Sequence, residues 1–150
     1  MRTWRGIIVH HTAGRSDASA EQIDHVHRTE RGFRAIGYHW LVRYDRLLRR
    51  WTVEAGRPET DDGAHCPGKN RTHLGVALAG DYRRTQPPTL ALSTLVMLLT
   101  DLCARHSISP AEIRPHSEYR ETECPGDQMR RALPVMRGRV ADLLPVAEAI

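Results

Sequence analysis

Two histidines and one cysteine, drawn from opposite ends of the chain, are the residues best suited to chemistry. His10 follows an apolar run at residues 7–9, whereas His116 and Cys124 lie close together in the last third of the chain. Two imidazoles and one thiolate are a ligand set that suits zinc. Three protein ligands leave the fourth position of a tetrahedral ion to water, which is typical of a catalytic zinc site.

Such a site would supply an activated water molecule. Coordination to zinc lowers the pKa of water from about 15.7 to roughly 7, so hydroxide becomes available near neutral pH. Cys124 also lies just before the presumed start of a helix at Asp127, where the helix dipole favours a thiolate. Spacing alone leaves the site open, because nine histidines offer many accidental combinations.

Each ligand needs a rigid element or a well-fixed loop to hold it. Residues 6–10 alternate and are rich in Ile and Val, which predicts a strand with His10 on one face and His11 on the other. His116 and Cys124 are eight residues apart, which is too far for one face of a helix. A loop that doubles back is therefore expected to bring these two side chains together.

A helix is predicted after the first strand. The pattern Ser19-Ala-Glu-Gln22 is a capping box that opens a helix to about residue 31, and Gly32 is expected to end it. His25 and His27 lie two residues apart on this helix, so they cannot bind one ion together.

Two further helices are predicted in the second half of the chain. Residues 89–106 form the clearest one, because apolar side chains recur there at helical spacing. These side chains are Leu92, Leu95, Val96, Leu99, Leu102 and Cys103. Asp127 is expected to cap a last helix, which Pro134 should interrupt.

The remaining periodic segments predict strands. Residues 38–43 and 47–53 are expected to form a hairpin, and residues 114–116 a short strand or extended lead-in. Residues 73–79 predict a central strand with small side chains on one face, which would let a helix pack closely over it. Strands interleaved with helices predict an α/β fold, in which a central mixed β-sheet is flanked by α-helices.

The composition is that of a globular protein with a single domain, residues 1–150, since 40% of its residues are hydrophobic and 27% are charged. Three widely spaced cysteines argue against a disulfide framework. The longest apolar run, residues 95–99, is too short to cross a bilayer, and no signal-peptide core follows the N-terminus. We therefore expect no membrane insertion and a protein that resides in the cytoplasm after synthesis. The net charge of +4 suits a polyanionic partner such as nucleic acid or an acidic cell wall, and it fits a generally basic surface equally well.

Short motifs along residues 6–130 occur in an order known from one family. They are His10-His-Thr-Ala13, Gly37-Tyr-His-Trp40, Thr52-Val-Glu-Ala-Gly-Arg57, Gly63-Ala-His65, Leu74-Gly-Val76 and the segment from His116 to Cys124-Pro-Gly-Asp127. With these motifs the chain resembles the type 2 N-acetylmuramoyl-L-alanine amidases. This family contains phage amidase endolysins and animal peptidoglycan recognition proteins, and the resemblance implies their fold.

The resemblance also implies roles for individual residues. The family's zinc ligands fall on His10, His116 and Cys124, and its catalytic tyrosine falls on Tyr38. Thr122 occupies the position of a catalytic lysine in similar phage members, whereas catalytic animal members have threonine there. A hydroxyl is a poorer stabiliser of developing negative charge than a cation, but this departure does not imply inactivity.

The implied reaction is hydrolysis of the amide between N-acetylmuramic acid and the L-alanine of the peptidoglycan stem peptide, with Zn²⁺ as cofactor. His65 and Asn70 match positions of the groove that binds this peptide. The compact length and the missing signal peptide fit a monomeric phage or prophage endolysin. Such an enzyme accumulates in the host cytoplasm and acts on the cell wall once released.

Three other functions compete with this one. A non-catalytic module could bind muropeptides in the same groove, although family members of that kind typically lack the cysteine that stands here as Cys124. A cytoplasmic wall-recycling amidase is a closer alternative, because it is also an amidase. Those relatives usually carry aspartate at the position of Cys124. A nucleic-acid binder with a structural zinc would need a fourth ligand and aromatics among its basic residues. Only 5% of the residues are aromatic, so no nucleic-acid partner is expected.

Overall fold

A five-stranded sheet forms the centre of the protein, for which a computed structural model describes residues 2–145. The strands are β1 (Gly6–His11), β2 (Trp40–Asp45), β3 (Arg50–Ala55), β4 (His73–Leu78) and β5 (Ile113–Pro115), and their order is β3-β2-β4-β1-β5. Only the pairing of β2 with the edge strand β3 is antiparallel, and the other neighbours are parallel. The sheet is therefore mixed, as predicted.

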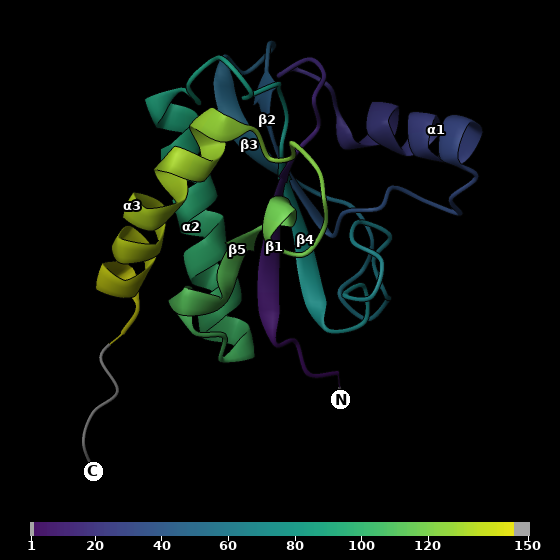
Figure 1. Cartoon of the computed structure of the whole chain (residues 1–150). Helices are drawn as coiled ribbons and strands as arrows, with labels where there is room; N and C mark the ends of the chain where they lie inside the picture. The colour runs from purple at the N-terminus through teal and green to yellow at the C-terminus, as the bar shows by residue number, and fades with distance from the viewer. Residues whose placement is uncertain (1, 146–150) are drawn as a thin grey trace.

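In the described part of the chain, three helices flank the sheet. Helices α2 (Thr89–His106) and α3 (Asp127–Leu143) lie together on one side of it, and α1 (Ala20–Arg31) lies on the other (Figure 1). Two short 3₁₀ turns, η1 (Pro110–Glu112) and η2 (His116–Glu118), precede and follow β5. Within residues 2–145, no helix is both long enough and apolar enough to cross a membrane.

The two faces of the sheet bury different side chains, as the alternation of the strands predicts. On the face covered by α2 and α3, a large cluster joins strand residues such as Ile7, Val9 and Val76 to Leu95 and Leu99. On the face toward α1, a smaller cluster holds Ile23, Ile36, Leu41, Ala77 and Ala79. His10 lies opposite Ala77 in the parallel pairing of β1 with β4, so its side chain is directed to this second face.

The predicted limits of α1 and α2 are confirmed. Ser19 caps α1, since its hydroxyl accepts from the Gln22 amide at 3.1 Å and the Gln22 side chain accepts from the Ser19 amide at 2.9 Å. Gly32 ends the helix in the left-handed conformation, with φ of +67°. Helix α2 spans residues 89–106, and the predicted apolar stripe faces the core.

The predicted hairpin strands are displaced, because β2 and β3 begin two and three residues later than residues 38 and 47. The turn between the strands explains the later start of β3. The Asp45 carboxylate accepts hydrogen bonds from the amides of Leu47 and Leu48, and Arg49 adopts a positive φ of 54°. These local bonds hold residues 46–49 in a turn and exclude them from a strand.

Two expectations for the last helix were wrong. Gly126 is the residue before α3, and Asp127 is the first helical residue, where its carboxylate pairs with Arg130 instead of capping the helix. Pro134 does not interrupt the helix, which continues to Leu143. Buried side chains on both sides of the proline, Leu133 and Met136 among them, pack into the large cluster and hold the helix together. Tertiary packing here outweighs the local cost of proline.

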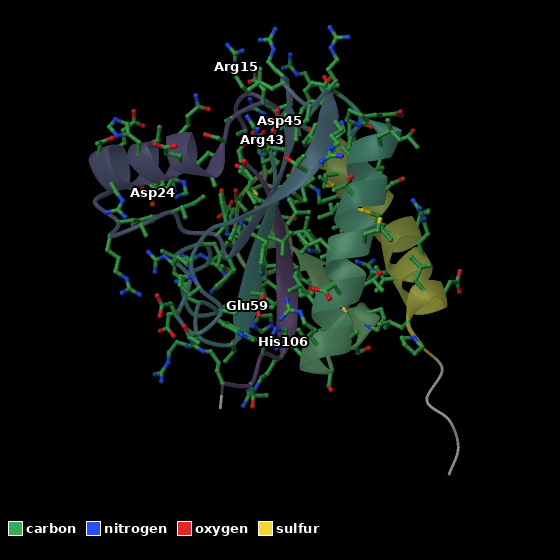
Figure 2. The ribbon with its side chains drawn as sticks, turned by 180° about the vertical axis from the view of Figure 1, so that it is seen from behind. Arg15, Asp24, Arg43, Asp45, Glu59 and His106 are labelled. Atoms are coloured by element: carbon green, nitrogen blue, oxygen red, sulfur yellow. The ribbon has the colours of Figure 1, made fainter. Side chains whose placement is uncertain are left out.

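The long connection from β3 to β4 carries one of the predicted site residues, His65, and is attached to α2. The Glu59 carboxylate accepts from the Trp40 indole at 2.7 Å and from the Arg105 guanidinium at 2.9 Å. It also lies 2.7 Å from His106 Nε2, a pairing visible from behind the molecule (Figure 2). These contacts fix the connection to the rigid part of the fold.

Candidate metal centre

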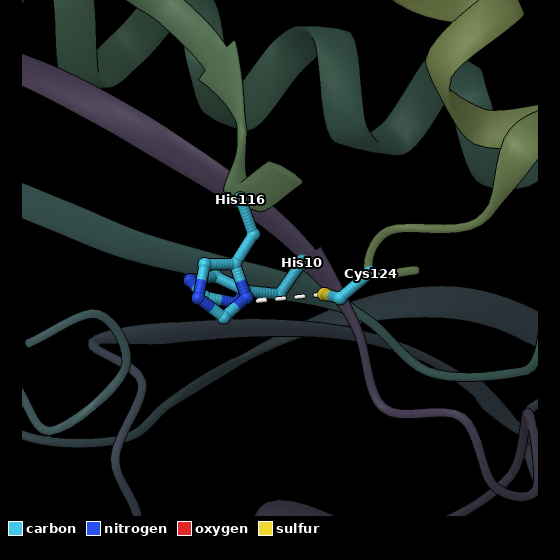
Figure 3. A group of neighbouring side chains, drawn as sticks. All are labelled: His10, His116 and Cys124. Carbon is cyan, nitrogen blue, oxygen red and sulfur yellow. Dashed lines mark hydrogen bonds between the residues drawn. The ribbon is translucent and has the colours of Figure 1, made fainter. Parts of the chain in front are cut away.

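The three predicted metal ligands come together at one end of the sheet. His10 lies near the end of β1, His116 directly follows β5, and Cys124 lies in the loop before α3 (Figure 3). One candidate ligand atom from each lies within 4.8 Å of the others, and this is the one such group found within residues 2–145. Strand pairing explains part of this convergence. Val9 of β1 pairs with Pro115 of β5, so the residues that follow them, His10 and His116, lie at the same height along the two strands.

The spacing of the His10 and Cys124 ligand atoms fits a tetrahedral zinc ion. Cys124 Sγ lies 3.6 Å from His10 Nδ1. Zinc bound to nitrogen at about 2.1 Å and to sulfur at about 2.3 Å would hold the two ligand atoms roughly 3.6 Å apart at a tetrahedral angle. Both ring nitrogens of His116 are buried and have no hydrogen-bond partner in the described part of the chain. A buried imidazole without partners is costly, and a bound cation would satisfy it.

A close backbone approach fixes the loop that carries Cys124. Gly126 has a φ of +93°, and a Cβ at this position would lie 2.3 Å from the carbonyl carbon of Tyr82. The Gln128 amide donates to the Tyr82 carbonyl oxygen at 3.0 Å, which joins the start of α3 to the same residue. Tyr82 itself donates its amide to His11 Nδ1 at 3.1 Å, so His11 joins β1 to the loop after β4.

Burial keeps the histidine ligands neutral. Desolvation lowers the pKa of His10 well below its ordinary value, and the neighbouring His65 and His116 lower it further. Desolvation also lowers the pKa of His116, with a smaller contribution from Arg120. Both rings can therefore offer a lone pair to a metal at neutral pH.

The cysteine does not gain its thiolate from the helix dipole, contrary to the sequence expectation. Burial raises the pKa of the Cys124 thiol to about 12. The desolvation of the thiolate thus outweighs the partial charge at the start of α3. A thiolate at this position needs a cation beside it, which is the role that a metal ion would fill.

A cavity of about 350 Å³ opens onto the three ligands, and both predicted catalytic residues line it. The Tyr38 ring lies 5.1 Å from the His10 ring, centroid to centroid. Burial, and then the nearby Cys124, raise the pKa of Tyr38, so its hydroxyl stays protonated and can donate. The Thr122 hydroxyl accepts from the Cys124 amide at 3.2 Å, which leaves its own proton free to donate into the cavity.

The two residues predicted to contact substrate have internal contacts. His65 is 7% exposed, with Nδ1 2.9 Å from His10 Nε2 and Nε2 3.0 Å from the carbonyl oxygen of His73. The Asn70 side-chain oxygen accepts from the amides of His65 and Cys66, both at 2.9 Å. Both residues also border a hollow beside the main cavity, and their contact with substrate stays a prediction.

Other residues that line the cavity were not identified as site residues from the sequence, among them His27, Arg31, Arg83 and Glu123. His27 is buried against Tyr38, and its Nδ1 accepts from the Gly37 amide at 2.9 Å. A signal for two of them does exist, since His27 and Arg31 are four residues apart and share one face of α1. Arg83 comes from the loop after β4 and gives no such signal.

Comparison with known proteins agrees with this geometry. A family model described as N-acetylmuramoyl-L-alanine amidase matches residues 1–127. Peptidoglycan recognition protein 1 of Bos indicus is 33% identical over 138 residues, which cover 86% of this chain and 70% of that protein. The endolysin of Klebsiella phage KP32 is 30% identical over 132 residues, covering 83% of this chain and 82% of the endolysin.

A solved structure is also similar. It is that of the N-acetylmuramoyl-L-alanine amidase LysC from Clostridium intestinale, with a TM-score of 0.81 and 28% identity over 93% of this chain and 87% of LysC.

Proposed function

The chain belongs to the type 2 N-acetylmuramoyl-L-alanine amidase family, and from this premise we propose that it is an active, zinc-dependent member. It would hydrolyse the amide between the lactyl group of N-acetylmuramic acid and the L-alanine of the peptidoglycan stem. The amide carbonyl carbon gains the oxygen of water, and the L-alanine nitrogen leaves as an amine.

The observation that carries the proposal is the ligand set itself. One donor atom each of His10, His116 and Cys124 lies within 4.8 Å of the other two, and the nitrogens of His116 have no hydrogen-bond partner within residues 2–145. The cavity on the open side of this point leaves room for water and substrate. Three ligands and an open side are typical of catalytic zinc, whereas structural zinc is closed by four ligands.

Zinc bound to these three residues would supply Lewis acidity toward the amide carbonyl and a water acidic enough to react at neutral pH. The Tyr38 hydroxyl donates a hydrogen bond toward the oxygen on which negative charge develops. Its raised pKa keeps the proton on the phenol during this step.

The Thr122 hydroxyl lines the same cavity as Tyr38. It accepts from the Cys124 amide, so it can donate its own proton to the same oxygen or to the reacting water.

A basic residue at the cavity suits the charge of the substrate. The exposed Arg31 lines the cavity, whereas Arg83 lines it with its guanidinium already paired with the Asp81 and Glu123 carboxylates. Stem peptides carry free carboxylates, and a guanidinium group forms bidentate hydrogen bonds with a carboxylate. The name of the Bos indicus relative, peptidoglycan recognition protein 1, agrees with peptidoglycan as the partner.

The biological role that we propose is that of a phage or prophage endolysin, made in the host cytoplasm and acting on the wall after release. The similarity to the endolysin of phage KP32, over most of both chains, supports this role. We propose that the protein acts as a monomer.

The decisive experiment is digestion of purified sacculi by zinc-loaded protein. Released peptides with a new N-terminal L-alanine, detected by mass spectrometry, are the expected product. A chelator should abolish their release, and added zinc should restore it.

Binding of muropeptides without release of peptides would instead assign a recognition function and overturn the proposed activity. Cleavage elsewhere in the sacculus would refute the assigned bond.

A further inference from the structure

The contacts of His65 extend the metal centre by one residue. His65 and His10 are 55 positions apart in the chain, yet His65 Nδ1 lies 2.9 Å from His10 Nε2. The other nitrogen of His65 lies 3.0 Å from the carbonyl oxygen of His73. The three residues therefore form a chain of hydrogen bonds that starts at a backbone carbonyl and ends at a candidate zinc ligand.

The carbonyl of His73 sets the direction of every hydrogen in this chain. A carbonyl oxygen only accepts, so His65 Nε2 must carry the hydrogen that lies between them. In a neutral imidazole Nδ1 is then an acceptor, and His10 Nε2 must donate to it. This leaves Nδ1 of His10 without a hydrogen, and that is the nitrogen 3.6 Å from Cys124 Sγ.

The surroundings hold the His65 ring where this chain needs it. A Cβ at Gly63 or at Gly75 would lie 2.5 Å from His65 Cδ2, so glycine at both positions makes room for the ring. The backbone of His65 is fixed through its amide, which donates to the Asn70 side chain at 2.9 Å. The small face predicted on β4 thus receives a histidine ring at Gly75, whereas Ala77 and Ala79 share a cluster with Ile23 of α1.

We propose that His65 is a positioning residue for the zinc site, which orients His10 and fixes the tautomer that binds metal through Nδ1. Partners of this kind commonly fix the ring of a metal-bound histidine and raise its basicity. This role rests on the metal site of the proposed function, and it differs from direct contact with substrate. It also explains why glycine stands at positions 63 and 75 and why the Asn70 side chain accepts from the His65 amide.

A pair of variants of similar size separates the hydrogen bond from packing. His65→Leu fills the space without an acceptor, whereas His65→Asn places a carbonyl oxygen near the position of Nδ1. We expect zinc affinity, measured by competition with a chromogenic chelator, to fall about 10–100-fold in His65→Leu. In His65→Asn it should recover most of this loss.

The visible spectrum of the cobalt-substituted protein should change in His65→Leu and return toward that of the wild type in His65→Asn. A purely structural role would lower the melting temperature of both variants and leave the zinc affinity of the folded protein unchanged. Equal zinc affinity in His65→Leu and the wild type would overturn the proposal.

The wild-type protein provides a test that needs no variant. Long-range ¹H–¹⁵N spectra of the zinc-loaded protein should show His10 protonated at Nε2 and His65 protonated at Nε2 as well. A His10 that binds zinc through Nε2, or a His65 protonated at Nδ1, would refute the assignment. These readouts do not require amidase activity, so a failure of the proposed reaction would be recognised separately.

Discussion

Replacing Gly75 by alanine tests how tightly the His65 ring is held against β4. The added Cβ would lie 2.5 Å from Cδ2, 2.6 Å from Cγ and 2.9 Å from Nδ1 of His65. Carbon atoms that are not bonded rest about 3.5–4.0 Å apart, so one of the two residues must move.

Neither residue can move freely. The Gly75 amide donates to His39 Nδ1 at 3.0 Å, and its carbonyl accepts from the His39 amide at 2.9 Å. The His65 ring can withdraw only by breaking its contacts with His10 and His73. Overpacking costs about 1–3 kcal/mol and each lost hydrogen bond adds about 1 kcal/mol. We expect Gly75→Ala to lower the free energy of unfolding by roughly 3–5 kcal/mol.

Thermal unfolding with chelator present measures this loss without a contribution from metal binding. For a chain of this size, the expected change is a fall in Tm of roughly 6–20 °C. The matched control is Gly138→Ala, the same chemical change in the interior of α3, where a Cβ would have no neighbour within 4 Å. Alanine favours a helix by up to about 1 kcal/mol over glycine, so the control should raise Tm.

The zinc affinity of the folded Gly75→Ala protein should also fall, by about 10–100-fold, because His10 loses its oriented partner. A variant with wild-type Tm and wild-type zinc affinity would show that the ring is not confined at Gly75. A fall in Tm with unchanged zinc affinity would show that the ring is confined but does not orient the ligand.

Three further perturbations address other parts of the structure. Tyr38→Phe should reduce kcat about 10²–10³-fold, the usual cost of one lost donor to a developing oxyanion, and should leave zinc content unchanged; full activity would remove the tyrosine from the mechanism. Cys124→Ser should abolish peptide release and weaken zinc binding in a chelator competition, because an alkoxide is a poorer zinc ligand than a thiolate; full activity would contradict the ligand set. Glu59→Gln should lower the free energy of unfolding by about 1–2 kcal/mol at neutral pH, because Arg105 is partly exposed and the charged hydrogen bonds are screened. The hydrogen bond from Arg105 is the main cause that lowers the pKa of Glu59 from 4.5 to about 2. The stabilisation is therefore complete above about pH 4.5 and is lost as the pH falls toward 2. The difference in Tm between Glu59→Gln and the wild type should shrink over that range, and a constant difference would exclude the charge as its source.

Local signals in the sequence were sufficient for much of the fold. The capping box at Ser19 and the apolar stripe of residues 89–106 act over one to five helical turns, and both helices begin and end where predicted. The alternation of residues 6–10 likewise placed His10 and His11 on opposite faces. These features depend on neighbours in the chain, which the sequence displays directly.

Features that depend on packing between residues far apart in the chain could not be predicted from local patterns. Pro134 continues in a helix because Leu133 and Met136 are buried in a core built from other elements. The contact of His65 with His10 spans 55 residues, and no local pattern indicates it. The pKa of Cys124 follows from burial by the finished fold, whereas the sequence shows only the helix that begins nearby. The joining of His10, His116 and Cys124 was proposed on chemical type and on the family resemblance, and the geometry supports it.

The wide separation of the metal ligands along the chain has a consequence for biosynthesis. His10 and Cys124 are 114 positions apart. At about 5–20 residues per second, the ribosome needs roughly 6–23 s to pass from one to the other. During that interval a nascent polypeptide has only part of the chelating set, so ion capture can be completed only after most of the protein has been translated. Under the proposed function, metal binding would thus be a late event that coincides with completion of the tertiary structure.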